Sequence, residues 1–187
     1  TSFDATTPQN ASVQVTVQNT DGEGVGGSNG GIAGDLIYNG DAVAADGPET
    51  DNTVPAGVNF SVTNNFGQEI MITDIGIEPA NGVIDALSDD ATPNGEVTRS
   101  EVYVDADVSD AHVDTSGTGI SIPSTVDLDT DGDITNNGNA VVSAGGNATV
   151  YLYEFEDGGG ELNMTDESLD ITLTYTLPNG LFGKKTV

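Results

Sequence analysis

Apolar and polar residues alternate at a period of two along much of this chain, and no segment has the apolar spacing of a helix. The cleanest run is Leu169 to Leu177, where Leu, Ile and Tyr alternate with Asp and Thr. Successive side chains of a strand point to opposite faces, so this pattern predicts strands with one buried face. Similar runs occur at 12–19, 58–63, 101–108, 120–122 and 140–142. Many short strands separated by turns predict an all-β fold, an Ig-like or jelly-roll-like β-sandwich.

The segment Glu69 to Ile77 changes phase in its middle. Its first two isoleucines fall on one face of a straight strand, and its last two fall on the other. A β-bulge near Thr73 and Asp74 would return all four to one face. A bend between two separate strands would explain the pattern equally well.

Other segments make simpler predictions. Thr149 to Glu156 is apolar on both faces, as in a central strand covered on two sides. Asn179-Gly180 suits a type I′ turn, so 181–187 is expected to return as the hairpin partner of the preceding strand. The polar stretches Asp41–Pro55 and Asn81–Ser100 are expected to be loops.

The charge balance restricts the partners of this chain. It has 31 Asp and Glu against 3 Lys and Arg, a formal charge of -28. Self-repulsion of this size destabilises a compact state in dilute buffer, whereas at ~1 M salt the Debye length is only about 3 Å. The composition therefore favours a high-salt environment. Phosphate backbones and anionic lipids would be repelled, so we expect no nucleic-acid partner and no membrane insertion.

One further feature favours an extracellular or cell-surface location. The sequence begins with Thr1, as expected if a signal segment has been removed. It contains no Cys, so its stability must come from the core, a metal ion or a partner. No apolar run approaches the ~20 residues that cross a bilayer as a helix.

Catalysis is not predicted. The single histidine, His112, has Asp110 and Asp114 nearby in the sequence and is expected to be a solvated loop residue. With one His and no Cys, a nucleophile–base pair has no support. Paired carboxylates prove nothing in a chain with 31 acids. We expect no enzyme activity.

One acidic loop has the spacing of a calcium site. Asp127, Asp129 and Asp131 precede Gly132 in the D-x-D-x-D-G order of an EF-hand-like loop, and Asp133 adds a carboxylate. The match ends there, because Gly138 stands where a closing Glu is required. The choice is between a structural Ca²⁺ that locks a turn and a solvated acidic turn without metal. No other cofactor is expected.

Four sequons make Asn10, Asn59, Asn147 and Asn163 candidate glycosylation sites. The number of sequons is what chance gives in a chain so rich in Asn, Ser and Thr. Glycosylation of these asparagines is therefore expected only if the protein is secreted.

The N-terminal part of the chain divides into a strand and a tether. Val13, Val15 and Val17 share one face of 12–19, and a Gly-rich stretch follows up to Gly31. The 11 residues of 21–31 have a flexible span of roughly 18 Å, more than a hairpin needs. We therefore divide the chain into an arm (1–31) and a sandwich domain (32–187). The arm is either an ordinary crossover or a strand donated to a neighbouring subunit.

The stretch SFDATTPQNASVQVTVQNTDG resembles the start of haloarchaeal secreted β-sandwich proteins, which are similar to the camelysin and TasA-type biofilm-matrix proteins. FSVTNNFGQEIMITDIGI and LDITLTYTLPNG resemble their body strands. These stretches are about a quarter of the chain, and the long Gly-rich insert departs from the pattern. The resemblance implies an extracellular filament, such as a pilus, thread or matrix fibre. It would be a head-to-tail homopolymer in which 12–19 is the donor strand.

Other classes remain open. A type IV pilin or archaellin assembles through a long hydrophobic helix, which 1–187 does not contain. A second hypothesis is a non-polymerising, calcium-stabilised adhesin or carbohydrate-binding module that contacts other cells or surfaces. It predicts an exposed aromatic platform, for which 5 Phe, 5 Tyr and no Trp are few. A third hypothesis, a secreted hydrolase, rests only on unplaced acids.

Overall fold

The computed structural model describes residues 34–45, 54–88, 100–115, 118–129 and 138–177, and the backbone of 182–186. Within these residues every regular element is a β-strand and no helix occurs, as expected. The strands are β1 (Leu36–Tyr38), β2 (Val43–Ala45), β3 (Gly57–Asn64), β4 (Ile70–Pro79), β5 (Ala86–Leu87), β6 (Val102–Ala106), β7 (Ala111–Val113), β8 (Ile120–Ser121), β9 (Ser124–Asp127), β10 (Ala140–Val142), β11 (Asn147–Leu152), β12 (Phe155–Glu156), β13 (Leu169–Thr176) and β14 (Phe182–Thr186).

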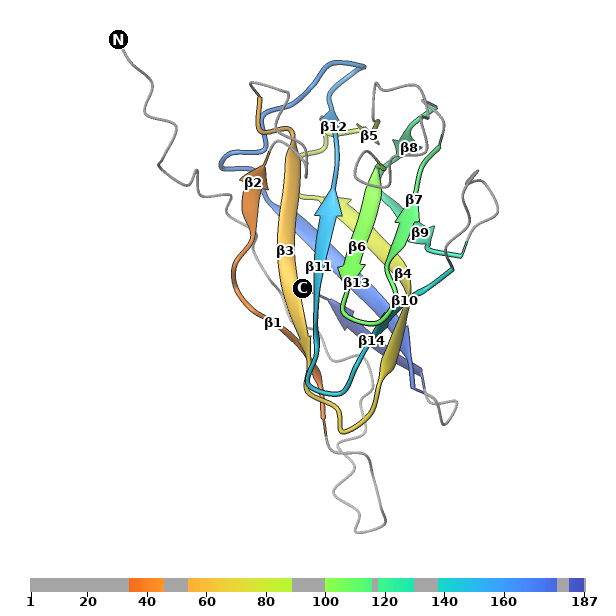
Figure 1. Ribbon diagram of the computed structural model, residues 1–187. Helices are drawn as coiled ribbons and strands as arrows, with labels where there is room; N and C mark the ends of the chain where they lie inside the picture. The colour runs from red at the N-terminus through yellow and green to blue at the C-terminus, as the bar shows by residue number, and fades with distance from the viewer. Residues whose placement is uncertain are drawn as a thin grey trace.

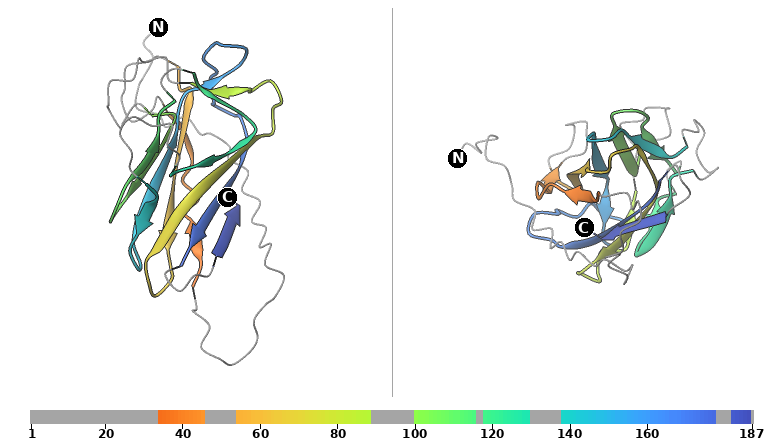
Figure 2. Two further views of the ribbon diagram at one scale, coloured as in Figure 1. Left: turned by 90° about the vertical axis from the view of Figure 1, so that its right-hand side faces the viewer. Right: turned by 90° about the horizontal axis from the view of Figure 1, so that it is seen from below.

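Two antiparallel sheets lie face to face, the arrangement of a β-sandwich (Figures 1 and 2). The six-stranded sheet has the order β1-β3-β11-β6-β7, with β2 also paired to β3. The five-stranded sheet has the order β10-β4-β13-β14, with β9 also paired to β4. A small sheet of β12, β5 and β8 lies at one end of the sandwich. The prediction of an all-β sandwich is confirmed.

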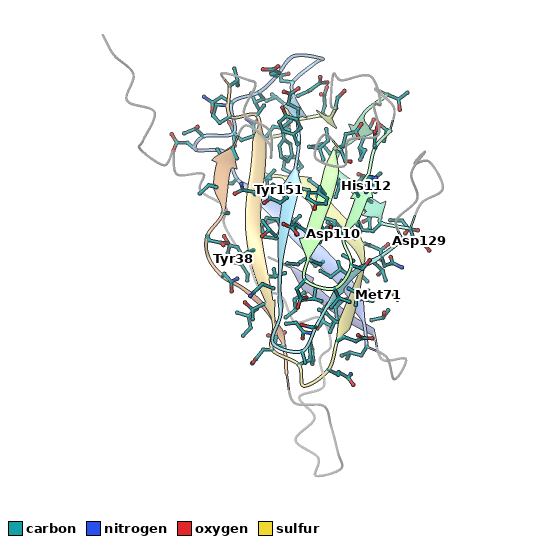
Figure 3. The ribbon with its side chains drawn as sticks, in the orientation of Figure 1. Tyr38, Met71, Asp110, His112, Asp129 and Tyr151 are labelled. Carbon is teal, nitrogen blue, oxygen red and sulfur yellow. The ribbon has the colours of Figure 1, made fainter. Side chains whose placement is uncertain are left out.

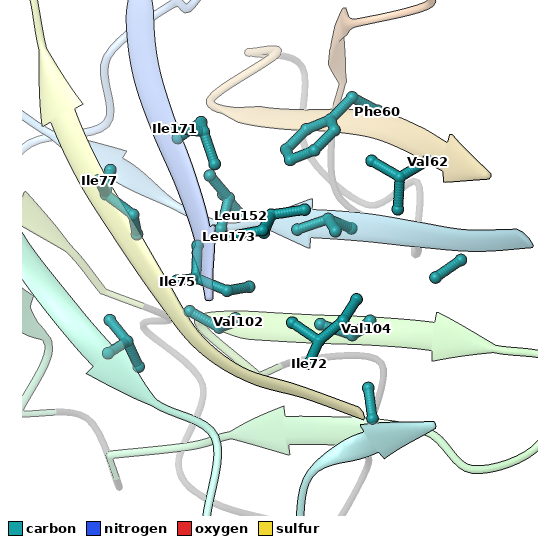
Figure 4. Close-up of a cluster of buried hydrophobic side chains, with 14 of the residues drawn as sticks. Phe60, Val62, Ile72, Ile75, Ile77, Val102, Val104, Leu152, Ile171 and Leu173 are labelled. Atoms are coloured by element: carbon teal, nitrogen blue, oxygen red, sulfur yellow. The ribbon is translucent and has the colours of Figure 1, made fainter. Parts of the chain in front are cut away.

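The core fills the space between the two large sheets (Figure 4). Inward residues of β3, β6 and β11 meet those of β4 and β13, and almost all are at most 2% exposed. β13 shows the pattern most clearly, because its residues alternate between buried and half-buried or exposed along the whole strand. Burial of this aliphatic surface is the main source of stability in a chain without cysteine.

A β-bulge in β4 resolves the phase change of this segment. Thr174 of β13 pairs with Asp74, and the next residue, Tyr175, pairs with Ile72. Thr73 is therefore the extra residue of the bulge. All four isoleucines of β4 consequently face the core, each at most 1% exposed. Of the two alternatives, the bulge is correct and the bend is not.

The buried Asn64 ties the two large sheets together at the end of β3. Its Nδ2 donates to the carbonyl oxygens of Gln68 (2.9 Å), Val142 (3.0 Å) and Ser143 (2.7 Å). Its Oδ1 accepts from the Phe66 N–H at 2.9 Å. Because β3 belongs to one sheet and Val142 to the other, a single amide side chain joins both.

The hairpin prediction at the C-terminal end is confirmed for the backbone. β14 pairs antiparallel with β13 from Thr172↔Thr186 to Thr176↔Phe182. The Asn179-Gly180 turn lies outside the described residues.

Several predictions of local structure were wrong. Asp41–Pro55 contains β2, and Asn81–Ser100 contains β5, so neither stretch is only loop. Both strands are very short. They form because they pair with neighbouring strands, and their own sequence pattern does not indicate them. Val108 is 55% exposed in the β6–β7 turn, outside the predicted buried face.

The segment 149–156 was predicted only in part. β11 is central in its sheet, as expected, but it ends at Leu152. Tyr151 is half-buried on its outer face, so the strand is not fully covered on both sides. Phe155 becomes buried because the chain leaves β11 and starts β12, which pairs with β5.

Candidate functional site

A row of side chains crosses the outer face of the six-stranded sheet. Asn59 pairs with Tyr151, Tyr151 with Tyr103, and Tyr103 with His112. Directly paired residues of antiparallel strands share a face. The row therefore spans β3, β11, β6 and β7, on the face opposite the core. Figure 3 shows Tyr151 and His112 on this face, with Asp110 between them near the β6–β7 turn.

Tyr103 and Tyr151 form the centre of this row. Their rings stack with centroids 5.6 Å apart and an interplanar angle of 18°. The Tyr103 hydroxyl points to Asp110 Oδ2 at 3.4 Å, and Asp110 Oδ1 accepts from the Ala106 N–H at 3.0 Å. Asp110 is thus held at the β6–β7 turn beside the ring pair.

The environment of the two phenols is electrically negative. Burial, Asp110 and Asp105 raise the pKa of Tyr103 to about 12. Burial and then Asp105 raise the pKa of Tyr151. Both hydroxyls therefore remain protonated donors at neutral pH, next to carboxylates that are acceptors.

The structure places His112 differently from the prediction. His112 belongs to β7 and is 7% exposed, so it is not a solvated loop residue. It was misjudged because its Asp neighbours in the sequence suggested a loop, whereas the pairing of β7 with β6 makes the segment a strand.

The other half of the face is polar. Asp41 Oδ1 accepts from the Ser61 N–H at 2.8 Å, and Asn39 Nδ2 donates to Ser61 Oγ at 2.7 Å. Thr63 Oγ1 lies 3.0 Å from Asn39 Oδ1 and 2.7 Å from Asn147 Oδ1. These bonds hold the β1–β2 connection against β3.

The face as a whole offers aromatic rings, hydroxyl donors and carboxylate acceptors. Such groups bind hydroxyl-rich ligands through stacking and hydrogen bonds, and they bind cations through ring and carboxylate together. The sequence analysis missed this pair of rings. The available signal was that Tyr103 and Tyr151 both alternate with buried valines, which indicates outward positions on two strands.

The predicted calcium residues are only partly within the described chain. Asp127 ends β9 and Asp129 lies in the following turn, where its N–H donates to Asp127 Oδ1 at 2.9 Å. Asp131 and Asp133 lie outside the described residues. Among the residues that the structure describes, no group of three or more His, Cys, Asp or Glu side chains is arranged to hold a metal ion. Asp127 and Asp129 alone do not make a site.

Three of the four candidate glycosylation sites are described. Asn59 is half-buried within β3, and Asn147 starts β11 with its side chain accepting from Thr63. Asn163 is exposed in a loop, and its Oδ1 accepts from the Thr165 N–H at 2.9 Å. Asn147 and Asn163 are both exposed, and Asn59 is less accessible. Asn10 lies outside the described residues, as do Val13, Val15, Val17 and the arm's proposed boundary.

Two buried carboxylates were not anticipated either. Glu101 is 0% and Glu154 is 2% exposed, near the end of the sandwich where β6 and β11 meet the small sheet. Glu101 accepts hydrogen bonds from the N–H and Oγ1 of Thr115, yet burial outweighs them and raises the pKa of Glu101. No sequence pattern distinguishes these two acids from the exposed ones.

Comparison with known proteins does not assign this chain to a family. No family model matches the chain, and no curated protein or solved structure matches it. Among the described residues, no helix is both long and apolar enough to cross a membrane. What the findings establish is an all-β, sandwich-like protein with antiparallel sheets.

Proposed function

We propose that this chain is a structural subunit of an extracellular filament that polymerises head to tail. In this proposal the strand 12–19 leaves its own subunit and adds to a sheet of the next one. The function of the protein is then its polymer, and it has no catalytic role. The acidic composition supports assembly in a high-salt environment.

The supporting observation is the difference between the two sides of the sandwich. On one side β10 and the β6–β7 turn are bonded across the sheets. The Val141 N–H donates to the Ser109 carbonyl oxygen at 2.8 Å. The Val108 and Ser109 nitrogens both lie 3.3 Å from the Val141 carbonyl oxygen. That side is occupied by backbone hydrogen bonds of the subunit itself.

The other side ends in β1, β2 and β14, the outermost strands there among the described residues. Figures 1 and 2 place β14 on the side of β1. An outer strand has backbone N–H and C=O groups with no partner in its own sheet, which an added strand can bind. The first described residue, Gly34, stands two residues before β1, so the chain that follows the arm enters the domain there. In this proposal the arm leaves the domain next to an outer strand and adds to an outer strand of the next subunit.

Electron microscopy in multimolar salt tests this proposal. The full chain should form regular filaments, and a chain starting at Gly22 should not. Val15→Asp, on the apolar face of 12–19, should abolish filaments, whereas Thr16→Asp adds the same charge to the other face and should weaken them far less. Well-folded monomers from the full chain would refute the proposal. If Val15→Asp then destabilised that monomer, the strand would belong to its own sandwich.

A second candidate function is a non-polymerising surface module that binds carbohydrate. The Tyr103–Tyr151 pair favours it, because these half-buried stacked rings lie on the outer face of a sheet among hydrogen-bonding side chains, the arrangement that such a module requires. Binding of neutral polysaccharides by the monomer, lost in Tyr151→Ala, would support this candidate.

Calcium stabilisation is a separate part of this second candidate. It would require a rise in melting temperature on adding Ca²⁺ that Asp131→Asn with Asp133→Asn removes. An unchanged melting temperature in the parent chain would contradict it.

A further inference from the structure

Basic residues are nearly excluded from this protein, and the exceptions are concentrated. The whole chain has 3 Lys and Arg: Arg99, Lys184 and Lys185. The ranges 34–45, 54–88, 100–115, 118–129 and 138–177 contain none. Two adjacent lysines therefore lie on one outer strand, β14, of a protein with charge -28.

The strand register separates the two lysines. Lys184 pairs with Thr174, which is half-buried on the outer face of β13, and Lys185 pairs with Leu173, which is buried. Lys184 thus has the register of the outer row, and Lys185 that of the core row.

The Tyr103–Tyr151 face, on the outer side of β6 and β11, differs from the lysine-bearing strand β14 in charge and in chemistry. Its two stacked rings lie beside Asp105 and Asp110, and both carboxylates act on the Tyr103 phenol. A ring pair with adjacent carboxylates attracts an ammonium group through the ring faces and through Coulomb energy. The aliphatic part of a lysine can pack on the rings, so part of this contact survives the screening of high salt.

We propose that the Tyr103–Tyr151 face of one copy binds Lys184 of a second copy of this chain. The face is on the six-stranded sheet and Lys184 is on an outer strand of the five-stranded sheet, so the contact joins different surfaces. An interface between different surfaces is head-to-tail, and where its rotation does not close a ring it extends into an open chain of subunits. This inference rests on the proposed homopolymer and gives it a second contact besides the donated strand.

Zero-length crosslinking of carboxylates to amines tests the contact directly. Equal amounts of ¹⁵N-labelled and unlabelled full-length protein are mixed before assembly and treated with a carbodiimide. Mass spectrometry should find Lys184 linked to Asp105 or Asp110 in mixed-isotope pairs. Crosslinks of Lys184 only within one copy, or only to other acids, would overturn the proposal.

Charge exchange gives an independent readout. Lys184→Asp should reduce the sedimentable fraction at least tenfold, Lys184→Arg should keep it, and Lys184→Asp combined with Asp105→Lys should restore it. Lys185→Gln, the neighbour in the other row, should have a much smaller effect than Lys184→Gln. Unchanged assembly of Lys184→Asp overturns this inference but leaves the filament proposal intact, whereas a parent chain that never assembles overturns both. Loss of polysaccharide binding in Tyr151→Ala with assembly unchanged would assign the face to a glycan instead.

Discussion

Replacing Asn64 by Ala should cost this protein a large part of its stability. The substitution removes the four hydrogen bonds that this amide makes to the β3–β4 turn, to the last residue of β10 and to the residue after it. Two of them, to the Val142 carbonyl and from the Phe66 N–H, are buried, and the other two reach partly exposed carbonyls. A buried polar group without a partner costs about 1–3 kcal/mol, so we expect the free energy of unfolding to fall by about 2–6 kcal/mol.

Urea unfolding followed by circular dichroism, at one fixed high salt concentration, measures this loss. Asn65→Ala is the matched control, because Asn65 is the next residue and its side chain is exposed. We expect the control to change stability by less than about 0.5 kcal/mol. A loss below about 1 kcal/mol for Asn64→Ala, or an equal loss for both variants, would refute the view that this amide joins the sheets.

Three further predictions follow from burial and charge. Leu173→Ala should lower the free energy of unfolding by about 2–5 kcal/mol in urea titrations, while Thr174→Ala on the outer face should change it by less than about 0.5 kcal/mol. The pKa of Tyr103 is about 12 in the folded state against an ordinary 10.0. The protonated phenol therefore contributes fully to folding stability below pH 10, and this contribution is lost as the pH rises from 10 to 12. Tyrosinate absorbance should show this late ionisation, and Asp110→Asn should move it towards pH 10. The raised pKa of Glu101 likewise means that stability falls as the pH rises above 4.5, and Glu101→Gln should flatten that part of the stability profile.

Local pattern was sufficient for the long strands of this protein. β13 alternates over its eight residues and β3 from Val58 to Thr63, and burial follows the alternation in both stretches. The change of phase in β4 indicated either a bulge or a bend, and only the pairing with β13 identified the bulge at Thr73. β2 and β5 were missed because their few residues stand in polar, turn-rich stretches of the sequence. β2 forms because it pairs with β3, and β5 forms because it pairs with β8 and β12.

The candidate site was harder to predict because it depends on which strands become neighbours. Tyr103 and Tyr151 are far apart in the sequence and meet only because β6 pairs with β11. His112 joins them only through the pairing of β7 with β6. Alternation showed that these tyrosines face away from the valines beside them, but no single strand indicates the residue on the next one. The calcium loop and the donor strand remain predictions from the sequence.

The position of Asn64 has a mechanical consequence for a filament. Tension on the arm enters the described domain at β1, whose first residue, Leu36, is the direct partner of Asn64 on β3. The Asn65 N–H also bonds to the Asp35 carbonyl at 2.9 Å, next to this point. Force that arrives there passes through the Asn64 amide into the end of β10 and the residue after it. Both sheets would therefore resist the pull together, and β1 would not have to peel from β3 alone.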